Sequence, residues 1–147
     1  MRSSIPVLLQ LFQAMASRLP SRLCPPLRAA HDELCRNLHL AFRLAAAHRQ
    51  VVMLEPYRKA CKGRLSVRLP EGVHWGRPAT VPLPPELDGT GWQDGRPRAI
   101  AITPQRQAMA NVWFVHHGQE ALCLRLGISG SVELLRYRPL LGAWTAC

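Results

Sequence analysis

The longest regular pattern of apolar and polar positions runs from Leu27 to about Met53, a stretch without glycine or proline. Apolar residues recur in it at spacings of three, four and seven, which is typical of a helix with one buried face. Pro25 and Pro26 precede the pattern, and a helix tolerates proline in its first turn. We predict one long helix whose buried face is formed by Leu27, Leu34, Leu38, Ala41, Phe42 and Ala45.

A second, shorter amphipathic pattern covers residues 5–18 and ends near Pro20, so we expect a further helix there. Residues 1–31 contain no acid and several arginines and serines, which is also typical of an organellar transit peptide. The run Ile5 to Met15 has the composition of a secretory signal as well, although two glutamines and Pro6 weaken that interpretation. We expect a cytoplasmic protein, with an organellar one as the alternative.

After Pro56 the pattern changes from helical to alternating, which predicts a half-buried strand with a basic outer face. Its apolar positions are Leu65, Val67 and Leu69, and its polar positions are Arg64, Ser66 and Arg68. Residues 70–98 contain six prolines and five glycines, so we expect mostly loop with a short edge strand at Ala79–Leu83. Trp75 and Trp92 are expected to hold this loop onto the body of the protein.

Four strand candidates follow, separated by glycine-containing turns that favour hairpins. One face of the third candidate carries Leu122, Leu124, Leu126 and Ile128, which must meet a core. The candidates are Ala99–Thr103, Asn111–His116, Ala121–Ile128 and Val132–Arg138.

These elements predict an α+β fold, in which N-terminal helices, one of them long, pack on a C-terminal antiparallel sheet of about four to six short strands. The length of 147 residues suits a single domain. It would comprise a helical part (1–54), a basic junction with the first strand and a Pro/Gly-rich loop (55–98), and a strand meander (99–147).

The charge of the chain is strongly asymmetric. The net charge is +10, of which +9 lies in residues 1–68 and +1 in residues 69–147. Such a field attracts phosphate polymers, anionic lipid or an acidic protein surface. The alternative is that the use of 17 arginines in place of lysines reflects the base composition of the genome, and that the charges are simply solvated.

Two groups of cations are candidates for phosphate contacts. The first follows the long helix, and Tyr57 within it offers a ring on which a base can stack. The second lies in the meander, where Trp113 and Tyr137 add aromatic surface and where strand register decides whether the cations share one face. The predicted nucleic-acid-binding residues are Tyr57, Arg58, Lys59, Lys62, Arg64, Arg68, Arg125, Arg136 and Arg138.

No residue pattern predicts catalysis, a cofactor or a metal. His31, Cys35 and His39 form a helical stripe, but eight residues of helix rise ~12 Å, too far for one zinc ion. His116-His117 fits an exposed turn, and Gly127–Ser131 joins two strands, whereas a nucleophile elbow joins a strand to a helix. The five cysteines contain no C-x-x-C pair and are expected to be reduced thiols.

We therefore expect a small basic protein without chemistry of its own, acting as a nucleic-acid-associated accessory or regulatory protein. The alternative is a protein–protein interaction or assembly module that uses the helix face and the tryptophan-bearing loop, because Trp and Arg are enriched at binding hot spots. The P-x-x-P sequence at Val81–Pro85 is interpreted as a stiff spacer. An enzyme whose site is assembled from distant residues is a further alternative.

Overall fold

The structure, a computed structural model, describes residues 22–57, 61–85, 97–109 and 111–147. These residues form one helix and eight strands, so the predicted α+β class is confirmed. The sequence predicted several helices, whereas the described part of the chain has one; the other predicted helix, residues 5–18, lies outside the described residues. The elements are α2 (Pro25–His48), β1 (Val52–Glu55), β2 (Arg64–Ser66), β3 (His74–Trp75), β4 (Ile100–Ile102), β5 (Asn111–His117), β6 (Glu120–Leu126), β7 (Val132–Arg138) and β8 (Ala143–Ala146).

The residues at the two ends of helix α2 explain where it begins and ends. It begins at Pro25 and Pro26, whose missing N–H groups would have no partner in a first turn anyway. It ends because Arg49 adopts the left-handed conformation (φ 52°, ψ 40°), and its N–H donates to the carbonyl of Ala45. The prediction that the helix continues to about Met53 was wrong, because the next apolar residues enter strand β1 instead. The buried face is Leu27, Ala30, Leu34, Asn37, Leu38, Ala41 and Ala45.

The strands form two sheets, where the sequence predicted one meander. The smaller sheet has the order β2-β1-β4, with β1 and β2 parallel and β1 and β4 antiparallel. A tight turn at Lys62-Gly63, closed by hydrogen bonds between Cys61 and Arg64, leads directly into β2. Gly63 has φ 75°, and its carbonyl accepts from Met53 N–H at 3.0 Å. The predicted basic strand is confirmed only for Arg64–Ser66, and the predicted strand at 99–103 joins this sheet rather than the meander.

The larger sheet is antiparallel and has the order β3-β5-β6-β7-β8. Strands β5, β6 and β7 lie within a residue or two of the predicted ranges. The prediction that Ile128 belongs to the buried face was wrong, because β6 ends at Leu126 and Ile128 is 70% exposed in the following turn. The predicted strand at Ala79–Leu83 is turn and coil.

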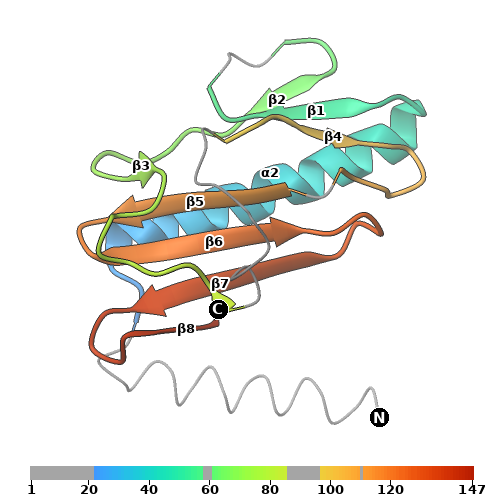
Figure 1. The fold of residues 1–147 in the computed structure, drawn as a ribbon. Coiled ribbons are helices and arrows are strands. Elements are labelled where there is room, and N and C mark those ends of the chain that lie inside the picture. The colour runs from blue at the N-terminus through green and yellow to red at the C-terminus, as the bar shows by residue number, and fades with distance from the viewer. Residues whose placement is uncertain (1–21, 58–60, 86–96, 110) are drawn as a thin grey trace, which may run out of the picture.

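Both sheets share the same helix. Figure 1 shows α2 crossing behind them, and it contacts β1, β2, β4, β5 and β6. Their buried side chains form one core, which includes Leu34, Leu54, Ile102, Trp113 and Leu122. None of the described helices is long and apolar enough to cross a membrane.

The opposite face of the larger sheet is covered by part of the Pro/Gly-rich loop. Phe114, Cys123 and Leu135 form a second cluster there, and Leu83 packs against it. The indole N–H of Trp144 donates to the carbonyl of Pro82 at 2.8 Å, so Trp144 fixes this loop. Trp92, to which the sequence assigned that role, lies outside the described residues.

Candidate nucleic-acid interface

The predicted junction residues lie at and beyond the end of β1. Tyr57 is 59% exposed and packs edge-on against Trp75, with ring centroids 6.0 Å apart. Lys62 and Arg68 are exposed on either side of β2. Arg58 and Lys59 lie outside the described residues. Tyr57, Lys62 and Arg68 therefore remain available to a ligand.

Arg64 is engaged inside the protein. Its guanidinium forms an ion pair with Glu55, whose side chain is nearly buried. A carboxylate in that position depends on its partner, because a buried charge without one is costly. The β1–β2 register brings these residues together although nine positions separate them in the sequence. Arg64 therefore contributes little free positive charge to the junction.

The three arginines of the meander do not form one patch. Arg125 lies on the loop-covered face and forms an ion pair with Glu133, directly across from it in β7. Arg136 pairs with Leu122, so Arg136 and Arg138 lie on the face that is turned toward the helix. Burial lowers the pKa of Arg136, and the charge of Arg138 lowers it further. Register thus separates Arg125 from the other two.

The exposed face of α2 carries cations that the sequence analysis did not single out. Arg28, Arg36 and Arg43 are exposed, and their spacings of eight and seven residues place them on one broad face of the helix. Fifteen residues of helix separate the first from the last, which is about 22 Å. Arg49 is exposed at the end of the helix. These arginines could have been identified from the sequence, since their positions lie opposite the apolar stripe of the helix.

Glu33 connects the helix to the junction. Its carboxylate accepts from Arg36, from the Asn37 amide at 2.8 Å and from the backbone N–H of Arg68 at 3.5 Å. Arg68 therefore lies beside the turn of α2 that carries Arg36. At the other end, the Lys62-Gly63 turn is bonded to Met53, close in sequence to Arg49. We call Arg28, Arg36, Arg43, Arg49, Lys62 and Arg68 the cationic surface.

The hydrogen bonds of Glu33 make stability depend on pH. Burial alone would raise the pKa of Glu33, but the bonds from Asn37, Arg36 and Arg68 outweigh it and hold that pKa below 4.5. The contribution to stability is therefore present above pH 4.5 and is lost as the pH falls through the folded-state pKa. Glu33→Gln should weaken the dependence of the free energy of unfolding on pH, measured by urea unfolding between about pH 3 and 6.

The matched control for Glu33→Gln is Glu71→Gln, which removes the same charge from an exposed turn. Its pH profile should follow that of the wild type. If Glu33→Gln also follows the wild type, the hydrogen bonds to Glu33 do not stabilise its charged form.

Ion pairs with arginine occupy half of the acids of the described residues and few of the exposed cations. Glu33, Glu55 and Glu133 each pair with an arginine, and Asp32 contacts His31 at 3.1 Å. Within the described ranges, eight exposed cations have no ion-pair partner. They are Arg22, Arg28, Arg43, Arg49, Lys62, Arg68, Arg98 and Arg106.

Comparison with family models, curated proteins and solved structures found no match. What the protein binds therefore has to follow from its own charges and geometry.

Several histidines and a cysteine make contacts with neighbouring groups of the protein itself. In the described part of the chain, no three His, Cys, Asp or Glu side chains are placed to hold one metal ion. His31 Nε2 lies 3.8 Å from Cys35 Sγ. His116 and His117 are half-buried rather than exposed at a turn, because each Nδ1 lies 2.9 Å from a carbonyl oxygen, of Gly76 and Gly72 respectively. These contacts hold the 72–76 segment against β5.

The described tryptophans also pack inside the protein. Trp113 is buried, Trp75 stacks edge-on against it with centroids 5.2 Å apart, and Trp144 packs on Phe114 at 5.9 Å.

Proposed function

We propose that this protein is a non-enzymatic accessory or regulatory protein that binds nucleic acid through phosphate contacts made by its cationic surface. The observation that supports the proposal is the unequal pairing of charges. Glu33 and Glu55 are held in ion pairs, whereas Arg28, Arg43, Arg49, Lys62 and Arg68 face solvent without an ion-pair partner among the described residues.

The chemistry of the cationic surface suits phosphate. A guanidinium donates two parallel hydrogen bonds to a phosphate, so five of the six side chains favour that ligand. Arg36 is paired with Glu33, but its side chain is 73% exposed and can also donate to a phosphate from the solvent side.

The dimensions of α2 also suit a polymer of phosphates. The ~22 Å between Arg28 and Arg43 corresponds to on the order of a dozen duplex phosphates. Contacts of this kind carry no base information, so we expect similar affinity for different sequences. Tyr57, exposed beside Trp75, is the one described aromatic near the junction on which an unpaired base could stack. Arg58 and Lys59 stay predictions from the sequence.

Co-purification tests the proposal. Full-length protein isolated at low salt should carry nucleic acid, which nuclease and high salt remove, and the stripped protein should bind added duplex DNA or single-stranded RNA. A stoichiometric protein partner that survives both treatments would instead support an interaction module. Stripped protein that ignores DNA, RNA and heparin at low salt would contradict the proposal.

A further inference from the structure

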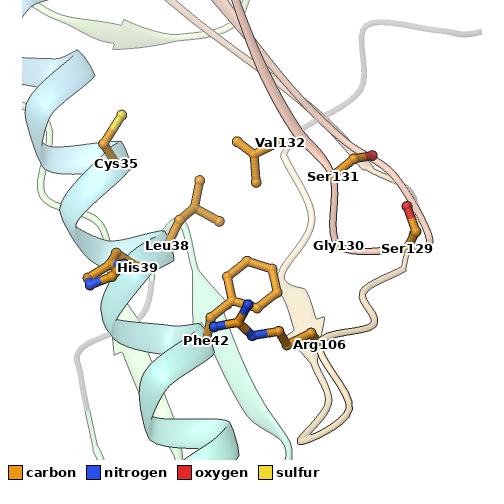
Figure 2. Close-up of a pocket in the computed structure, with 9 residues that line it drawn as sticks. All are labelled: Cys35, Leu38, His39, Phe42, Arg106, Ser129, Gly130, Ser131 and Val132. Atoms are coloured by element: carbon orange, nitrogen blue, oxygen red, sulfur yellow. The ribbon is translucent and has the colours of Figure 1, made fainter. Parts of the chain in front are cut away.

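A groove lies between α2 and the turn that connects β6 to β7. It has a volume of about 510 Å³, within the range of ~300–1,000 Å³ that is usual for small-molecule sites. Figure 2 shows the side chains of Leu38, Phe42 and Val132 in its middle, with the Arg106 side chain extending from the other wall toward α2. None of its nine lining residues is acidic. The remaining five are Cys35, His39, Ser129, Gly130 and Ser131.

The walls of the groove are held together by close backbone contacts. Gly130 has φ 80°, and a Cβ at this position would collide with the carbonyl oxygen of Arg106 and press on the Phe42 ring. Ala108 N–H donates to the carbonyl of Ile128 at 3.2 Å. Glycine at 130 therefore allows the β6–β7 turn, the 103–108 segment and α2 to approach one another, so the groove is largely formed before a ligand arrives.

Arg106 has an unusual backbone for a non-glycine residue. Its φ is 61°, a left-handed conformation that residues with a side chain rarely adopt. A turn holds it there, in which Arg106 N–H donates to the Thr103 carbonyl at 3.1 Å and Gln107 N–H donates to Thr103 Oγ1 at 3.1 Å. This conformation carries the guanidinium into the groove (Figure 2). Strained residues of this kind cluster at ligand sites.

We propose that this groove binds a small amphipathic anion, a monocarboxylate with a hydrocarbon tail. The carboxylate would lie on the Arg106 guanidinium, which has no ion-pair partner among the described residues. The tail would cover the half-buried Phe42 and Val132, which is 44% exposed, above the buried Leu38. The positive charge of Arg106 favours an anionic head group, and the apolar residues of the groove favour a hydrocarbon tail. The inference is independent of nucleic-acid binding, because Arg106 is not part of the cationic surface.

Titration calorimetry of the full-length protein tests the inference with three probes of equal chain length. Decanoate should bind, whereas decanol and decyltrimethylammonium should bind at least about tenfold more weakly, because neither carries a negative charge that can pair with the Arg106 guanidinium. Arg106→Gln should weaken decanoate binding by a similar factor. Arg98→Gln, which removes an exposed arginine outside the groove, should leave it unchanged.

A second pair of variants tests the location of the tail. Val132→Trp fills the groove and should abolish decanoate binding, whereas Ile128→Trp, in the turn that precedes β7 but outside the lining, should not. Circular dichroism checks that both variants fold. Equal binding of decanol, insensitivity to Arg106→Gln, or no decanoate binding up to about 1 mM would overturn the inference. So would displacement of decanoate by a peptide of residues 1–21, which would assign the groove to the chain's own segment.

Discussion

Replacing Trp113 with alanine should lower the free energy of unfolding by about 3–5 kcal/mol. The side chain is 1% exposed and lies in the core that α2 shares with both sheets. Its indole N–H donates to the carbonyl of Arg98 at 2.8 Å, just before the chain enters β4 of the smaller sheet. Trp113 itself belongs to β5 of the larger sheet. The substitution therefore removes a large core side chain and a hydrogen bond that joins the sheets.

Urea unfolding followed by circular dichroism measures this effect. Tyr57→Ala is the control, because it removes an exposed ring that makes only an edge contact with Trp75, and it should change stability by less than about 1 kcal/mol. If Trp113→Ala lowers the free energy of unfolding by no more than Tyr57→Ala does, the shared core does not hold the two sheets together. Two separate unfolding transitions in the wild type would contradict the shared core as well.

Neutralising four members of the cationic surface should almost abolish nucleic-acid binding. The variant carries Arg28→Gln, Arg43→Gln, Lys62→Gln and Arg68→Gln, all at exposed positions, so the fold should persist. Each lost phosphate contact weakens binding about tenfold at 50 mM salt, because fewer counterions are released. The affinity should therefore fall roughly 10³–10⁴-fold, by a similar factor for duplexes of different sequence. Fluorescence anisotropy with a labelled DNA duplex measures it.

A second quadruple variant separates the position of the charges from their number. Arg98→Gln, Arg106→Gln, Arg125→Gln and Arg138→Gln change the net charge by the same amount away from the cationic surface. This control should weaken binding by no more than about tenfold, through the long-range field alone. Equal losses in the two variants would show that net charge, and no particular surface, attracts the nucleic acid.

The elements with a strong local pattern could be predicted from the sequence. The apolar residues of α2 repeat over many turns, and the β5–β6 and β6–β7 hairpins have glycine at Gly118 and Gly130, both with positive φ. Strand β1 could not be separated from the end of the helix, because a short apolar run such as Val51–Leu54 fits either structure. The division into two sheets depends on pairings between distant residues, such as Leu54 with Ile100.

The candidate site was predictable to a smaller extent. The outward arginines of α2 could have been found from their spacing opposite the apolar stripe. The ion pairs of Arg64 and Arg125 could not, because strand register alone brings Glu55 and Glu133 to them. The groove at Arg106 depends on a left-handed backbone and on the contact with Gly130, and neither leaves a pattern in the local sequence.

The dependence of duplex affinity on salt concentration tests the phosphate contacts most directly. With four to six contacts, the logarithm of the affinity should fall against the logarithm of the salt concentration with a slope of about −4 to −5. The quadruple variant of the cationic surface should lower the magnitude of that slope by about 3–4. A wild-type slope near zero, or no binding of the duplex at low salt, would contradict the proposed function.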